Sequence, residues 1–224
     1  MTPDGGELLD AAARAVFDSV DGRARLAPLL ASFDAAVGRF LEDDAPRDLL
    51  LAIRLDWALC DATPSDARDA ADTWLRRAAA GELPDVPPDP AWEPLLATHA
   101  SVFEVWPTSD GAFLRDIVRG VCLPLVEPMG LHPAPRGPAA VWDARLIVTS
   151  DGARLCRAPL LYPLDVLTLL HRYATATFEA AFEPATCVLP LRRAWLAVHR
   201  QPRLAPERAF RTALAGWGNA ASSS

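Results

Sequence analysis

The side chains that most often do chemistry in proteins are few and widely spaced in this sequence. Its four histidines and four cysteines all stand singly, without the short paired spacing of zinc ligands. His132 lies in an irregular, proline-rich segment and is the histidine with the most freedom to act. A cysteine such as Cys122 could meet it in space and form a nucleophilic Cys–His pair. One hypothesis is therefore a small metal-binding or hydrolytic protein built around His132 and Cys122.

Other catalytic arrangements are excluded by the residues that the chain lacks. It has no lysine, and all 22 basic side chains are arginine. A phosphate loop of the G-x-x-x-x-G-K type, a Schiff-base lysine and a lysine general base all require that residue. No G-x-S-x-G segment provides a serine nucleophile. The sequence therefore favours a protein that is not an enzyme, and we assign it no catalytic residue, no metal ligand and no cofactor.

The charge of the chain bears on nucleic-acid binding. Its formal net charge is -7, which argues against a general affinity for nucleic acid, because phosphate contacts need a basic surface. The best candidate for a local basic patch is the segment 191–211 of the predicted C-terminal helices. Its members are Arg192, Arg193, Arg200, Arg203, Arg208 and Arg211. An alternative hypothesis is therefore a nucleic-acid-associated protein that uses these helices, with Arg192 and Arg193 as binding candidates.

Seven tryptophans offer a different kind of site. Trp57, Trp74, Trp142 and Trp195 fall on apolar stripes and are predicted core residues. The other three, Trp92, Trp106 and Trp217, lie near prolines or a chain end. Large aromatic side chains on exposed connectors favour docking onto another surface, although a tryptophan flanked by prolines can equally hold a linker against its own domain. With Trp92 and Trp106 as candidates, the sequence favours a non-enzymatic interaction or adaptor protein with a protein partner.

The elements that must position these side chains change character along the chain. Residues 1–82 have the three- and four-residue apolar spacing of helices, the fourth of which is expected to run from Thr63 to Ala78. A proline-rich connector follows over residues 83–100. Residues 101–161 alternate with a period of two, and residues 162–219 return to helical spacing up to a disordered tail at 220–224. The predicted fold class is α+β.

The alternating stretch predicts a small β-barrel or strongly bent sheet. Asp-Gly pairs at residues 110–111 and 151–152 are hairpin signals. On the longest strand, Asp143 and Arg145 point away from an apolar face. That face consists of Trp142, Ala144, Leu146 and Val148. Four or five short antiparallel strands of this kind need a cover, which the flanking helices can provide.

Four segments of the chain stand out as a set. They are R-L-D-W-A-L-C-D at residues 54–61, S-V-F-E-V-W at 101–106, F-L-R-D-I-V-R-G at 113–120 and V-W-D-A-R-L-I-V at 141–148. Together they resemble uncharacterised bacterial proteins with an LDW helix and a small FEV/LRD barrel, over roughly residues 50–161. Some of those proteins carry a C-terminal SEC-C zinc motif, which is absent here. The resemblance implies a scaffold and no activity.

The compartment is predicted from the termini and the cysteines. The first residues are acidic and polar, unlike a secretory signal. Single cysteines are typical of a reducing cytosol, and no apolar run approaches the ~20 residues that span a bilayer. We therefore expect a cytoplasmic protein without a membrane partner.

Overall fold

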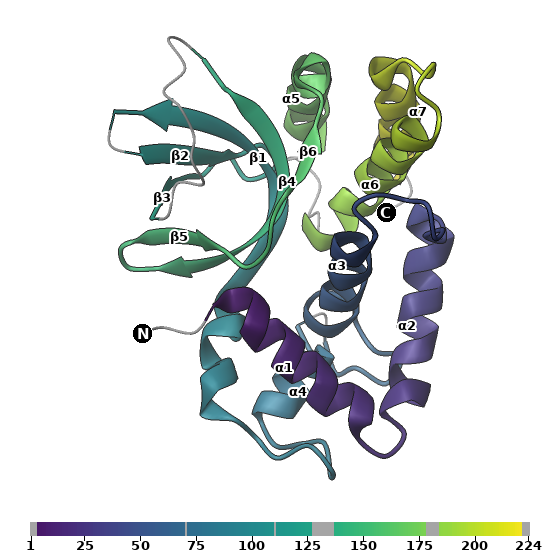
Figure 1. The fold of residues 1–224 in the computed structure, drawn as a ribbon, viewed down its shortest axis with the longest axis vertical. Coiled ribbons are helices and arrows are strands. Elements are labelled where there is room, and N and C mark those ends of the chain that lie inside the picture. The colour runs from purple at the N-terminus through teal and green to yellow at the C-terminus, as the bar shows by residue number, and fades with distance from the viewer. Residues whose placement is uncertain (1–3, 70, 110, 127–136, 178–183, 221–224) are drawn as a thin grey trace. The chain divides into compact units, whose positions relative to one another are not determined.

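The computed structural model describes residues 4–69, 71–109, 111–126, 137–177 and 184–220 (Figure 1). It confirms the predicted α+β fold class. The chain divides into two units, Met1–Thr98 and His99–Ser224. The division lies at the end of the predicted connector, so that the connector belongs to the first unit and the strands begin the second.

The first unit is helical. Its elements are α1 (Gly5–Asp18), α2 (Gly22–Val37), α3 (Arg47–Cys60), α4 (Trp74–Ala79) and the 3-10 helix η1 (Pro90–Ala97). Asp4 caps α1, because its carboxylate accepts the Gly6 amide hydrogen at 2.9 Å. The apolar faces meet in a core where the Phe33 and Trp57 rings lie 5.5 Å apart. The predicted core position of Trp57 is therefore confirmed.

The fourth helix is much shorter than the sequence predicts. It begins at Trp74 and not at Thr63, so the expected extent was wrong. Aspartate side chains in the preceding segment bind backbone amides and hold turns instead of a helix. Asp69 accepts the Ala71 amide hydrogen at 2.8 Å, and Asp72 accepts the amide hydrogen of Arg68 at 2.8 Å.

The proline-rich connector folds against its own unit. Its last part is η1, which packs against α1, and Asp89 caps η1 by accepting the Ala91 amide hydrogen at 2.8 Å. Trp92 on η1 is only 4% exposed. Trp92 therefore holds the connector against its own unit and is not exposed for docking onto another surface.

The second unit contains a closed β-barrel. Its strands are β1 (Thr98–Thr108), β2 (Gly111–Asp116), β3 (Cys122–Leu125), β4 (Ala140–Thr149) and β5 (Gly152–Leu155), with β6 (Leu160–Tyr162) added beside β4. The order is β1-β2-β3-β5-β4, and a β1–β4 pairing closes the ring. One pair, β3–β5, is parallel, which the hairpin signals did not indicate. This is a Greek-key arrangement.

A glycine makes the parallel closure possible. Gly152 begins β5 with φ of +138°, a conformation that side chains disfavour. A Cβ atom there would come within 2.5 Å of the Pro124 carbonyl oxygen on β3. The close approach of β5 to β3 therefore depends on the absence of a side chain.

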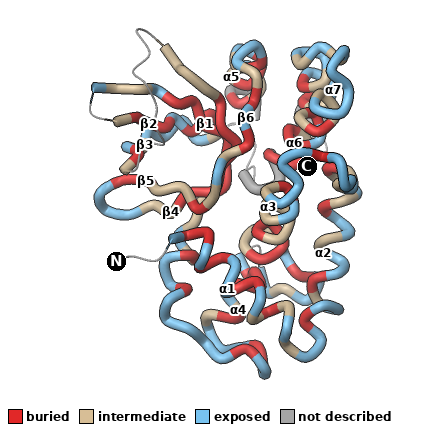
Figure 2. The backbone as a smooth tube through the Cα atoms, viewed as in Figure 1, coloured by how far each residue is buried: buried red, intermediate tan, exposed pale blue. Residues whose placement is uncertain are grey.

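The barrel encloses an apolar core to which β4 contributes strongly. Trp142, Ala144 and Leu146 point inward as predicted, whereas Val148 is only half-buried. Asp143 and Arg145 lie on the opposite face and are buried as well. Most of β4 is therefore buried on both faces (red in Figure 2).

Helices lie against the outer face of β1, β4 and β6. They are η2 (Leu164–Val166), α5 (Leu167–Thr177), α6 (Pro184–Arg200) and α7 (Pro206–Ala220). The ring of Tyr162 on β6 lies 5.2 Å from that of Phe210 on α7, and Trp195 on α6 donates to the Leu161 carbonyl oxygen at 2.9 Å. Among the described helices, none has both the length and the hydropathy to cross a membrane.

Candidate interaction surface

A row of apolar side chains crosses the outer face of β1, β2 and β3. The strand register places Trp106 opposite Phe113, and Phe113 opposite Pro124. Because alternate residues point to opposite faces of a strand, their neighbours Val105, Leu114 and Leu125 fill the barrel core while these three point outward. Trp106 is 36% exposed, Phe113 is 46% exposed, and Pro124 is exposed. We call Trp106, Phe113 and Pro124 the outer row.

The indole of Trp106 is held in place by a buried carboxylate. Its Nε1 donates to Glu104 Oε2 at 3.1 Å, and Glu104 is 2% exposed. The other oxygen of Glu104 is paired with Nε2 of His171 on α5. Glu104 therefore links the outer row to α5 and restrains the position of the indole N–H.

Two arginines follow the outer row along β2. Arg115 is two residues beyond Phe113 on the same face, and its side chain is 48% exposed. Its Nη1 forms an ion pair with Glu104 Oε2 at 3.6 Å, a separation that exceeds hydrogen-bond distance. Arg119 is exposed in the turn between β2 and β3. Across the residues that the structure describes, neither guanidinium group forms a hydrogen bond, so both keep donors available to a ligand.

A buried aspartate holds the turn that carries Arg119. Asp116 Oδ1 accepts the amide hydrogens of Val118 and Arg119, at 2.8 and 3.0 Å. Burial raises the pKa of Asp116, but hydrogen bonds from His99 and from the turn outweigh burial and hold that pKa below its ordinary value. Ser101 also donates to Asp116 and not to His99. This Ser–Asp–His group therefore positions the turn. It lacks the hydrogen bond from serine to histidine that would activate a serine nucleophile.

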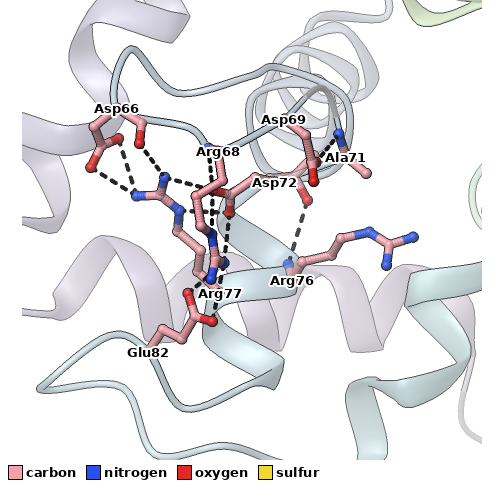
Figure 3. A network of polar contacts seen from close by, with 9 residues as sticks. Asp66, Arg68, Asp69, Ala71, Asp72, Arg76, Arg77 and Glu82 are labelled. Carbon is pink, nitrogen blue, oxygen red and sulfur yellow. Dashed lines mark hydrogen bonds and ion pairs between the residues drawn. The ribbon is translucent and has the colours of Figure 1, made fainter.

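A second polar cluster lies in the first unit, around Asp72. Figure 3 shows the Asp72 carboxylate between Arg68 and Arg77. Arg77 also binds Asp66, and Arg68 binds Glu82. Hydrogen bonds from Arg77, and then from Arg68, lower the pKa of the Asp72 carboxyl far below its ordinary value. The guanidinium of Arg77 lies 4.9 Å from the centre of the Trp74 ring.

An open hollow of about 530 Å³ lies beside this cluster, lined by Arg68, Asp72 and Leu96 among others. Of the charged side chains on its wall, Arg68 is paired with Asp72 and Glu82, whereas the guanidinium group of Arg76 has no ion pair among the described residues. The network accordingly explains how the turns before α4 are held, and nothing in it indicates a ligand.

The predicted binding residues lie in different places. Trp106 belongs to the outer row, whereas Trp92 is buried in the first unit. Arg192 is 6% exposed and binds Asp143 through Nε and Nη2, at 2.7 and 2.9 Å. A phosphate could reach it only after this buried pair opens. Arg193, its neighbour on α6, is exposed.

The proposed Cys–His pair is described only in part. Cys122 is exposed on β3, opposite Arg115. His132 lies outside the described residues, as does the side chain of Trp217. Within the described part of the chain, no group of three or more histidine, cysteine, aspartate or glutamate side chains could hold a metal ion.

Sequence reasoning missed Phe113, Pro124, Glu104 and Arg115. The alternation from Ala112 to Asp116 contained a signal, because only one of its two faces carries an arginine. Both faces also carry apolar residues, however, so the pattern alone does not say which face is outside.

Comparisons of the chain with protein-family models, with curated proteins and with solved structures found no match. The resemblance to proteins with an LDW helix and an FEV/LRD barrel therefore stays a prediction.

Proposed function

We propose that this protein is a non-enzymatic interaction module whose partner binds to the outer row of the barrel. One observation carries the proposal: Trp106 and Phe113 are neighbouring exposed aromatic side chains on a closed sheet. Tryptophan and other large side chains contribute most of the binding energy at many interfaces. An exposed pair of them needs a reason other than stability of the fold.

The hydrogen bond to Glu104 supports a binding role for Trp106. An indole that already has a fixed orientation loses less conformational entropy when a partner covers it. Phe113 on β2 and Pro124 on β3 continue the exposed apolar surface beside it. The outer row is therefore organised before binding.

The location in the barrel agrees with a general tendency. Five-stranded Greek-key barrels often bind extended ligands across their second and third strands. This comparison of folds supports the location of the site on the barrel and does not identify the partner.

We also propose that the protein works in a reducing compartment such as the cytoplasm. Cys60, Cys122 and Cys156 are thiols and not disulfides, as cytosolic proteins usually have.

Affinity capture from the native host tests the proposal when it compares two matched double variants. Trp106→Ala/Phe113→Ala removes both aromatic rings of the outer row, and we expect it to lose the captured partner. Leu161→Ala/Leu164→Ala removes exposed apolar side chains from elsewhere in the second unit, and it should retain that partner. Equal capture by both variants would place the interface away from the outer row.

A further inference from the structure

We propose that the ligand of the outer row is a single-stranded nucleic acid. This inference rests on the proposed function and adds the chemical class of the partner. Three features of the second unit support it: the neighbouring rings, the two arginines with available donors, and the charge of the unit as a whole.

The rings suit unpaired bases. Directly opposed residues of antiparallel strands have Cβ atoms about 4.5–5.5 Å apart, so Trp106 and Phe113 are cross-strand neighbours on the outer face of the barrel. Stacking on such side chains is indifferent to base identity, because every base has a π-face. The Glu104 hydrogen bond leaves the indole face, and not its N–H, as the group available for contact.

The arginines suit phosphates. Arg115 lies about 7 Å from Phe113 along β2, and Arg119 lies farther along, in the following turn. A strand whose bases cover Trp106 and Phe113 can therefore bring its backbone past both guanidinium groups. Each group keeps unused donors, and guanidinium binds phosphate through paired hydrogen bonds.

The net charge of the chain conceals an uneven distribution. The first unit has 9 arginines and 19 acidic residues, whereas the second has 13 arginines and 10 acidic residues. The acidic character that argues against nucleic-acid binding thus belongs to the unit without the outer row. The barrel unit has the sign of charge that attracts a polyanion.

A double helix does not fit the same surface. Its bases are stacked on one another, so their faces cannot cover protein rings, whereas single strands offer those faces. An acidic peptide could bind the arginines but would not need the rings. These two ligands are therefore the informative competitors.

Fluorescence anisotropy of the full chain with a labelled oligothymidylate of about 12 nucleotides tests the inference. We expect binding that weakens as salt increases, and no comparable binding of a duplex or of a polyglutamate of the same length. Binding of polyglutamate or duplex as tight as that of the single strand would overturn the inference. Absence of oligothymidylate binding at about 50 mM salt would also overturn it.

Variants identify the surface. Phe113→Ala and Trp106→Ala should each weaken binding by roughly 5- to 150-fold, and Trp106→Phe, which keeps a ring, should weaken it less. Arg115→Ala should lower the salt slope by about 0.7, while the exposed Arg193→Ala on α6 should leave the slope unchanged. A lower salt slope in Arg193→Ala alone would place the phosphate contact on the C-terminal helices.

The two proposals can fail separately. If oligonucleotides do not bind but partner capture still depends on Trp106 and Phe113, the interaction module stands and the nucleic-acid ligand is rejected. If oligonucleotides bind in a way that is insensitive to the outer row, the nucleic-acid ligand of the outer row is rejected, and partner capture alone decides the interaction module.

Discussion

Asp143, Tyr162 and Arg192 form a buried polar group between the barrel and α6. The Tyr162 hydroxyl donates to Asp143 Oδ2 at 3.0 Å, and Arg192 binds both oxygens of the same carboxylate. Burial, and then the charge of Asp143, raise the pKa of Tyr162 well above its ordinary value. Arg192 thus neutralises a carboxylate that β4 buries, which accounts for an arginine on the covered face of α6.

We predict that Arg192→Met destabilises the protein by about 3 kcal/mol or more, because it leaves the Asp143 carboxylate buried without its cation. The triple variant Asp143→Leu/Tyr162→Phe/Arg192→Met removes the polar group entirely and should recover most of that loss. Urea unfolding measures both. As a control, Arg193→Ala at the exposed neighbour should change stability by less than about 0.5 kcal/mol. A small effect of Arg192→Met would contradict the structural role.

The Asp72 cluster predicts a pH dependence. Its arginines lower the pKa of Asp72 from the ordinary 3.8, so the ionised form stabilises the folded state above that value. Asp72→Asn should therefore be less stable than the natural chain at pH 6, and the difference should shrink as pH falls below about 4. Urea unfolding midpoints of Asp72→Asn and of the natural chain, measured from about pH 6 to below about pH 4, test this prediction. Asp85→Asn, on an exposed side chain of the same unit, should show no such trend; a constant deficit for Asp72→Asn would contradict the linkage.

At the scale of the elements, closure of the barrel depends on the close approach of β5 to β3. We predict that Gly152→Ala destabilises the protein by about 3 kcal/mol, because it combines a positive φ with a Cβ contact of 2.5 Å to Pro124. Gly120→Ala also has a positive φ, of +70°, but its Cβ would meet no atom within 4 Å. It should cost only about 1 kcal/mol. Thermal unfolding compares them, and equal losses would mean that closure does not depend on the close approach.

The sequence predicts elements well where one periodicity dominates. The apolar spacing of α1 and the inward face of Trp142, Ala144 and Leu146 both follow from local pattern. The start of α4 does not, because Asp69 and Asp72 satisfy backbone amides that a helix would otherwise use. The parallel β3–β5 pair joins strands separated by a long segment, and no local signal encodes it.

At the scale of the molecule, the same residue type has opposite roles in the two units. Trp92 and Trp106 both lie near prolines, yet one is buried under α1 and the other is exposed on β1. Sequence context could not separate them, because burial depends on packing partners far along the chain. The register of β1 with β2 brings Trp106 beside Phe113. The candidate surface can therefore be recognised only once the pairing of these strands is known.

Site-specific photo-crosslinking in the native host tests most directly whether the outer row is the binding surface. A benzophenone amino acid replaces either Phe113 or Leu164, two side chains of equal exposure in the second unit. The account predicts a discrete crosslinked species, protein or nucleic acid, from position 113 and none from position 164. Crosslinks from position 164 alone, or the same products from both positions, would contradict it.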